Sequence, residues 1–317
     1  MYHIIVNPAS RSGRGRQIWK TIIKPALMEK NIAYEVYFSE QAGDVTEFAR
    51  QITSSFEAGE NEKALCQLIL LGGDGTVNEA LQGISSFERV VIGYIPTGSS
   101  NDLARDMGIA KKPLAALERI LAAQNHMESA AKTMDRGIVH TQKSDRSFAV
   151  SCGIGFDAAV CEEAMNSQIK DTLNRLGLGK LTYLGIAIKQ LFAAKPVSCT
   201  LFLDDREPVH IKKILFAAFM NHRFEGGGFK FCPTADYGDG IFDLCVVGNL
   251  PKLLILFALP TAFFGKHFIF PGVTHYRAKH IHVETSAPLW LHTDGEVHEK
   301  TMHLEMSCAQ REIRFIV

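Results

Sequence analysis

A glycine-rich segment lies where an apolar run gives way to a helical pattern in the first third of the chain. The run Leu70-Leu71 is followed by Gly72-Gly73-Asp74-Gly75-Thr76, and a helical pattern begins at Val77. Three glycines in four positions let the backbone approach a bulky anion, and a helix N-terminus offers N–H groups and a favourable dipole. A tight Gly-Asp-Gly turn alone would need neither the further glycines nor the threonine. We therefore interpret residues 72–76 as a phosphate-binding loop.

The first third of the sequence alternates short β-rich runs with longer helical patterns, which is typical of a parallel α/β sheet. The patterns predict strands at 3–6, 34–38, 67–71 and 90–95, and helices at about 16–30, 45–56, 77–84, 100–107 and 113–123. After about residue 130, β-rich runs separated by turn residues predict a mainly antiparallel β-sandwich with one helical insertion around 181–192. These runs lie at 148–152, 197–203, 214–219, 241–247, 281–284, 289–292, 302–306 and 313–317. We expect an α/β nucleotide-binding domain over residues 1–130, to which 300–317 could return, and the sandwich over 131–299.

Composition excludes several classes of protein. Lys+Arg and Asp+Glu are equal at 34 each, which argues against binding nucleic acid by bulk charge. The seven cysteines are scattered without a Cys-x-x-Cys pair, which favours reduced thiols in a cytosolic protein. No secretory signal pattern opens the sequence, and the most apolar window, 253–264, is too short to span a bilayer. We therefore expect a cytoplasmic protein that does not bind nucleic acid.

Two further loops follow predicted strands of the same sheet. Pro96-Thr97-Gly98-Ser99-Ser100-Asn101-Asp102 comes after the fourth strand, with three hydroxyl side chains and a pair that can cap a helix. Asn7-Pro8-Ala9-Ser10-Arg11-Ser12-Gly13 comes after the first strand, with small and basic residues suited to phosphate oxygens. Loops at the carboxyl ends of neighbouring parallel strands share one crevice. We expect these two loops to face residues 72–76, although a simple helix cap and a solvated loop are the alternatives.

Taken together, these motifs resemble the diacylglycerol kinase catalytic domain family, which includes sphingosine kinases and bacterial lipid kinases. The resemblance extends over nearly the whole chain and includes Glu225-Gly226-Gly227-Gly228, Asp239-Gly240 and Asp294-Gly295-Glu296. It implies an N-terminal domain like those of NAD kinase and phosphofructokinase that binds ATP with Mg²⁺. It also implies a β-sandwich that holds the lipid, with the active site in the cleft between the two domains. Ser99 stands where the family usually has Thr, and Leu103 where it often has Phe, so the choice of lipid stays open.

The resemblance assigns roles to individual residues. The expected nucleotide-binding residues are Asn7, Ser39, Gly72, Gly73, Asp74, Gly75, Thr76, Asn78, Thr97 and Gly98. The expected catalytic residues are Glu296, Asp294 and Asp74, with Glu296 favoured as the base that accepts the proton of the lipid hydroxyl. A carboxylate such as Asp74 beside phosphates requires a divalent cation between them. The loop with Asp236, Asp239 and Ile241 resembles the family's structural Mg²⁺ site, and a glycine-rich hairpin is the equal alternative.

The implied reaction is ATP-dependent phosphorylation of diacylglycerol or a related lipid, as in phospholipid biosynthesis. Two stretches, 172–203 and 266–282, carry cations around apolar patterns and predict peripheral contact with an anionic membrane at its inner face. The alternative is that their apolar stripes belong to the core. The sequence leaves the oligomeric state open, with a homodimer as one alternative. Competing functions are a soluble kinase similar to NAD kinase, and a nucleotide-binding regulator without catalytic activity.

Overall fold

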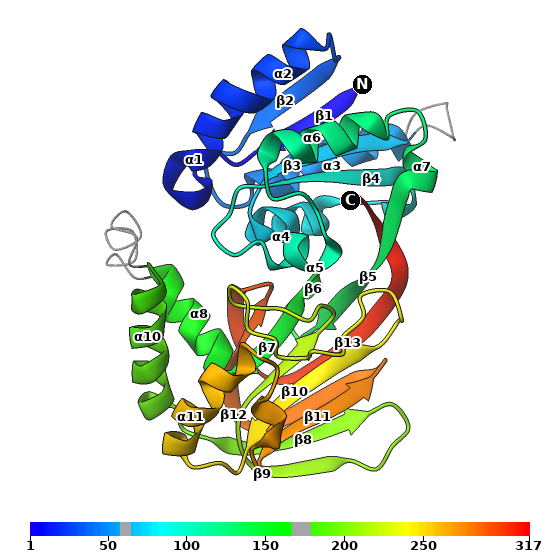
Figure 1. Ribbon diagram of the computed structural model, residues 1–317. Coiled ribbons are helices and arrows are strands. Elements are labelled where there is room, and N and C mark those ends of the chain that lie inside the picture. The colour runs from blue at the N-terminus through cyan, green and yellow to red at the C-terminus, as the bar shows by residue number, and fades with distance from the viewer. Residues whose placement is uncertain (58–64, 167–178) are drawn as a thin grey trace. The chain divides into compact units, whose positions relative to one another are not determined.

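The computed structural model describes residues 1–57, 65–166 and 179–317 (Figure 1). The chain forms two compact units. The first comprises Met1–Arg136 and Gln310–Val317, and the second comprises Gly137–Ala309. The first unit is therefore built from two separate segments of the sequence, and each unit is described below by itself.

A parallel sheet forms the centre of the first unit. Its strands are β1 (Tyr2–Val6), β2 (Tyr34–Phe38), β3 (Cys66–Gly72) and β4 (Val90–Pro96), in the order β2-β1-β3-β4. The end of β13 (Glu296–Ile316) adds to β4 in parallel through Phe315 and Ile316. Nearly every residue of β1, β3 and β4 is buried, as expected for parallel strands that are covered on both faces.

The helices of the first unit connect these strands. They are α1 (Ser10–Ile18), the π-helical turn η1 (Trp19–Ile23), α2 (Lys24–Glu29), α3 (Asp44–Glu57), α4 (Asp74–Gly83), the 3₁₀ turn η2 (Phe87–Arg89), α5 (Asp102–Met107), α6 (Pro113–Ala122) and α7 (Met127–Ala130). The predicted start of the fourth of these α-helices at residue 77 is wrong. Gly73 is extended and caps a helix that already begins at Asp74, so the glycine-rich segment itself forms the first helical turn.

The second unit is an antiparallel β-sandwich, as predicted. Its strands are β5 (Ala131–His140), which begins in the first unit, β6 (Asp145–Phe148), β7 (Ser151–Gly155), β8 (Val197–Leu203), β9 (Val209–Met220), β10 (Phe242–Gly248), β11 (Val273–Ala278), β12 (Ile281–Thr293) and the first part of β13. The long strands β9 and β12 both pair with β7 near one end and with β8 near the other. These shared pairings join the two layers around a core that includes Phe148, Phe219 and Phe242.

The runs predicted at 281–284 and 289–292 belong to one strand, β12, and those at 302–306 and 313–317 belong to β13. The strand predicted at 148–152 is interrupted at Ala149 and Val150, because their N–H groups bind a side chain rather than a neighbouring strand. The helices of this unit are α8 (Phe156–Asn166), α10 (Gly179–Ala193), α11 (Lys252–Ala262) and the 3₁₀ turn η3 (His267–Ile269). Among the described residues, no helix is both long and apolar enough to cross a membrane.

Candidate active site

Hydrogen bonds connect three loops at the carboxyl ends of β1, β3 and β4. Asn7, after β1, donates from Nδ2 to Oγ1 of Thr76 in the first turn of α4, over 3.1 Å. The hydroxyls of Ser10 and Thr97 share a hydrogen bond of 2.7 Å. The main-chain N–H of Thr97 also donates to the carbonyl of Gly72 over 2.7 Å. The three predicted loops therefore form one hydrogen-bonded surface.

Two glycines are fixed by close contacts, one within the glycine-rich segment and one between two loops. A Cβ atom at Gly72 would lie 2.2 Å from Oγ1 of Thr76, and one at Gly98 would lie 2.6 Å from Cα of Gly73. Because both contacts are shorter than any real Cβ contact, neither position accepts a side chain without displacing a loop. The first turn of α4 lies beside this junction, and within it the N–H of Thr76 donates to the carbonyl of Gly73 over 3.0 Å.

The carboxylate of Asp74 links the first turn of α4 to the start of α5. Its Oδ2 accepts the main-chain N–H of Asp102 over 2.9 Å, and its Oδ1 lies 3.4 Å from the hydroxyl of Tyr94. Burial and the Asp74 charge raise the pKa of Tyr94 well above its usual value, so Tyr94 remains a neutral donor. Asn101 holds the turn before α5 in a left-handed conformation and accepts the N–H of Gly98 over 2.9 Å. Sequence reasoning treated Asp102 only as a cap; its carboxylate is buried and accepts a hydrogen bond from Arg105 over 3.0 Å.

The other predicted nucleotide residues differ in accessibility. Ser39 is half-buried just after β2, and its N–H donates to the carbonyl of Val6 over 3.0 Å. Gly75 is also half-buried, in the first turn of α4. Asn78 is fully buried, with its Oδ1 3.4 Å from Nε2 of Gln82. The side chain of Asn78 therefore faces protein rather than solvent.

In the second unit, Asp294 begins a tight turn between β12 and β13 and has a φ of 51°. Its carboxylate accepts three consecutive main-chain N–H groups, from Ala149, Val150 and Ser151, over 2.9, 2.7 and 3.0 Å. Glu296 is half-buried at the first position of β13. Asp294, the first acidic residue of the Asp294-Gly295-Glu296 motif, therefore holds the β6–β7 connection in place.

A buried histidine supports the same turn. His292 has no exposed surface, and its Nε2 lies 3.3 Å from Oδ2 of Asp157 and 3.3 Å from Oε1 of Glu225. The two carboxylates favour a proton on Nε2, which fixes the tautomer in which Nδ1 is free to accept a hydrogen bond. On the other side of the ring, Nδ1 accepts the N–H of Gly295 over 3.1 Å.

This cluster was missed in the sequence, although Glu225 opens the Glu-Gly-Gly-Gly motif and His292 lies two residues before Asp294. Its three ligand atoms are close enough together to hold a metal ion. However, a neutral imidazole that binds a metal through Nε2 carries its proton on Nδ1, where Gly295 already donates. The hydrogen-bond pattern therefore suits a proton donor at Nε2 better than a metal ligand.

The loop predicted to hold a structural Mg²⁺ ion satisfies its charge with protein groups. Oδ1 of Asp239 accepts the N–H of Ile241 over 3.0 Å, and Oδ2 contacts the guanidinium of Arg277. Oδ1 of Asp236 accepts the N–H of Gly238 over 3.0 Å. A cation at Asp239 would have to displace Arg277, so this arrangement does not fit a metal cage. A Mg²⁺ ion in this loop stays a prediction from the sequence, and this geometry does not support it.

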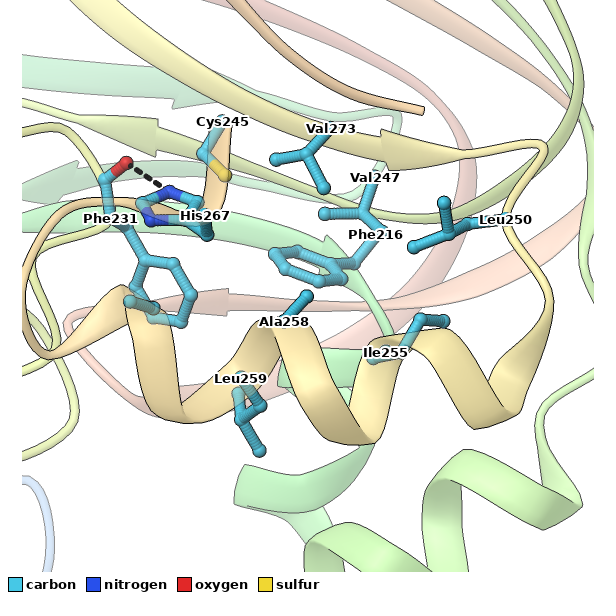
Figure 2. A pocket seen from close by; sticks show the side chains of 11 residues that line it. Phe216, Phe231, Cys245, Val247, Leu250, Ile255, Ala258, Leu259, His267 and Val273 are labelled. Atoms are coloured by element: carbon cyan, nitrogen blue, oxygen red, sulfur yellow. Dashed lines mark hydrogen bonds between the residues drawn. The ribbon is translucent and has the colours of Figure 1, made fainter. Parts of the chain in front are cut away.

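An apolar pocket lies between β9, β10, β11 and α11 (Figure 2). Figure 2 shows Ala258 of α11 pointing toward Phe216 of β9, with Val247 and Val273 on the opposite wall. His267 closes one end, and its Nε2 is 3.0 Å from the carbonyl of Phe231. Burial lowers the pKa of His267, which keeps the ring neutral there. The volume of this pocket is about 30 Å³, which is too small for an acyl chain.

Comparisons with known proteins bear on both units. Residues 1–132 match the diacylglycerol kinase catalytic domain, and residues 150–315 match the YegS C-terminal NAD kinase beta sandwich-like domain. YtlR from Bacillus subtilis (strain 168) is 30% identical over 302 residues, which cover 93% of each chain. The chain belongs to the diacylglycerol kinase catalytic domain family. The predicted family, enzyme class and fold class are therefore confirmed: this is a lipid kinase with the two-domain architecture of its family.

Further similarities agree with this assignment. A protein from Mycobacterium tuberculosis (strain CDC 1551 / Oshkosh) named diacylglycerol kinase is 30% identical over 233 residues, covering 72% of this chain and 70% of that protein. A solved structure from Bacillus anthracis str. Sterne superposes with a TM-score of 0.72 at 21% identity, over 99% of this chain and 96% of the other. At that identity the structural similarity supports the fold alone.

Proposed function

We propose that this lipid kinase transfers the γ-phosphoryl group of ATP to a hydroxyl of diacylglycerol or a related lipid. The observation that carries the proposal is the hydrogen-bonded junction of the loops after β1, β3 and β4. A nucleotide triphosphate is the substrate that suits three such loops, because their N–H groups and hydroxyls can surround a chain of phosphates. The names of the relatives support diacylglycerol as the first acceptor to test.

The nucleotide would lie against the first turn of α4. Thr76 and Thr97 are held by Asn7 and Ser10, so their hydroxyls are ordered before a ligand arrives. The carboxylate of Asp74 lies at this junction, where it accepts the main-chain N–H of Asp102, and an oxygen ligand of this kind suits Mg²⁺. When bound there, Mg²⁺ would neutralise phosphate charge during transfer.

Glu296 is the proposed general base. A base must release and accept a proton during each turnover, but Asp294 uses both carboxylate oxygens to hold three main-chain N–H groups. Proton uptake by Asp294 would therefore weaken the connection that it organises. Glu296 leaves the same turn as a half-buried side chain, and it would take the proton of the lipid hydroxyl as that oxygen attacks the phosphorus.

His292 is proposed as a positioning residue for this base. Its Nδ1 holds the N–H of Gly295, the residue immediately before Glu296. Asp157 and Glu225 fix the opposite edge of the ring, so the turn cannot rotate without breaking contacts on both sides. A change at His292 should therefore lower kcat more than it alters KM for ATP.

The test is an assay with purified protein, γ-labelled ATP, Mg²⁺ and a panel of lipids in mixed micelles, with products resolved by chromatography. We expect a labelled lipid, and loss of labelling in Glu296→Gln while ATP binding is preserved. Glu305→Gln, at an exposed glutamate further along β13, is the matched control. Label on NAD alone would overturn the lipid proposal, and full activity of Glu296→Gln would overturn the assigned base.

The same proposal gives the protein a cytoplasmic location with peripheral contact at the inner face of the membrane. A lipid substrate requires such contact, because its hydroxyl lies at the bilayer surface. Of the two stretches predicted to make it, residues 172–178 lie outside the described part of the chain.

A further inference from the structure

Helix α11 is apolar on every side. No charged residue follows Lys252 in the helix, and the apolar sequence continues through Phe264. Its inner face carries Ile255, Ala258 and Ala262, which are buried against the pocket in Figure 2. A helix that is apolar all round is normally covered by protein or by lipid. The inner face of α11 therefore leaves other apolar side chains of the helix to be accounted for.

The outer face of α11 forms a narrow exposed stripe. Leu253, Phe257 and Pro260 follow one another at intervals of four and three residues, which places them on one side of the helix, and Phe264 follows two residues after its end. Leu253 is 64% exposed, Phe257 69% and Phe264 75%. Ile269 in η3, which contacts α11, is 75% exposed. We call these five residues the α11 surface.

Large exposed apolar side chains concentrate here. Within residues 1–57, 65–166 and 179–317, twelve such side chains are exposed, and five of them lie between positions 253 and 269. Single exposed apolar residues need no explanation, but a contiguous group marks an interaction surface.

The charged residues in the sequence around α11 are of one sign. No Asp or Glu occurs between Asp243 and Glu284, whereas this stretch contains three lysines and one arginine. Lys252 donates to the carbonyls of Phe192 and Ala194, over 2.7 and 2.6 Å, which brings the exposed Lys195 close to the start of α11. The exposed Lys266 follows the other end of the stripe. An apolar stripe with cations at both ends matches the interface of an anionic bilayer.

We propose that the α11 surface docks the protein on anionic membranes, with the aromatic rings entering the acyl region and the lysines meeting lipid phosphates. A second copy of the chain is a poorer occupant. In a two-fold symmetric dimer the same patch faces itself, so the cations would oppose one another without an acidic residue between 243 and 284 to offset them. The inference rests on the membrane contact already proposed for this lipid kinase and assigns a surface to it, and vesicle binding does not itself require phosphoryl transfer.

The test measures binding to vesicles without nucleotide, so that it can fail independently of the kinase proposal. Full-length protein is sedimented with phosphatidylcholine vesicles that contain or lack phosphatidylglycerol. We expect binding to the anionic vesicles and about a tenfold weaker partition for each of Phe257→Ser and Phe264→Ser. Lys266→Gln should weaken binding to anionic vesicles about fivefold. The matched control is Leu114→Ser on α6, at an exposed leucine in the other unit.

If the serine variants fold poorly, a tryptophan variant tests the same surface by fluorescence. In Phe257→Trp, the indole emission should shift to the blue on addition of anionic vesicles, and bromine-labelled lipid should quench it. Vesicle binding that is equal in the wild type, Phe257→Ser and Phe264→Ser would overturn the proposal. So would light scattering that shows a dimer disrupted by those two changes, with no binding to vesicles.

Discussion

The roles assigned to Asp294 and Glu296 can be separated by one pair of substitutions. Asp294 accepts the N–H groups of Ala149 and Ser151 through different carboxylate oxygens, and that of Val150 through the same oxygen as Ser151. In Asp294→Asn the amide oxygen can still accept two of these bonds. The amide nitrogen would then face the N–H of Ala149, and because both groups are donors this hydrogen bond would be lost.

The size of the effect follows from these three bonds. A hydrogen bond to a charged group contributes about 1.5–3 kcal/mol and a neutral one about 0.5–1.5 kcal/mol. Losing one charged bond and neutralising two others would cost about 4 kcal/mol if the contributions added fully. Because Asp294 is partly accessible to water and neighbouring bonds are not additive, we expect a free energy of unfolding lower by about 2–3 kcal/mol. This corresponds to a melting temperature about 4–12 °C lower for the second unit.

The assay is thermal and urea unfolding followed by circular dichroism, with turnover measured on the same preparations. Glu296→Gln should unfold within about 0.5 kcal/mol of the wild type. Its kcat should nevertheless fall by about 10²–10⁴-fold. The reasoning is refuted if Asp294→Asn melts with the wild type, or if Glu296→Gln loses stability rather than turnover.

Three further outcomes are expected. Gly98→Ala should abolish ATP binding measured by calorimetry, because its Cβ would meet the opposite loop at 2.6 Å, whereas Gly185→Ala, where nothing lies within 4 Å, should bind normally. Burial alone would raise the pKa of Asp243. Hydrogen bonds from His275 and Thr234, together with the charges of His275 and Arg277, outweigh burial and lower this pKa. The stability that Asp243 adds should be present above an unfolded pKa of about 4 and lost as pH falls through the lower folded pKa, and Asp243→Asn should flatten this acid limb in unfolding titrations. Without nucleotide, Mg²⁺ should not raise the melting temperature of the wild type through the Asp239 loop, whereas Arg277→Gln should make that loop responsive to Mg²⁺.

The parallel sheet and its loops could be predicted because their signals are local. Glycines at 73 and 98 are needed where two loops touch, and such positions can be recognised by composition and by their place after an apolar strand. The order of the strands then brings the loops together, since parallel strands align their carboxyl ends. The same reasoning placed Asp74 at the junction, and the structure adds only its partners.

The second unit was harder to predict because its site depends on contacts between distant residues. His292 meets Asp157 and Glu225 from positions 135 and 67 residues away, and no spacing rule connects them. Helix α11 was not predicted from the sequence because it has no polar face, and without one its apolar residues show no helical periodicity. The break between β6 and β7 depends on a carboxylate that comes about 145 residues later.

The return of the chain at Gln310 has a consequence for biosynthesis. Strand β4 is the edge of the parallel sheet until Phe315 and Ile316 pair with Ile92 and Gly93. At a synthesis rate of about 5–20 residues per second, the 180 residues between Arg136 and Ile316 impose a delay of roughly 10–40 s. During that time an apolar strand edge stands unpaired on the nascent chain, which is a known cause of aggregation. A chaperone that shields β4 on the ribosome would therefore affect the yield of this protein more than its final stability.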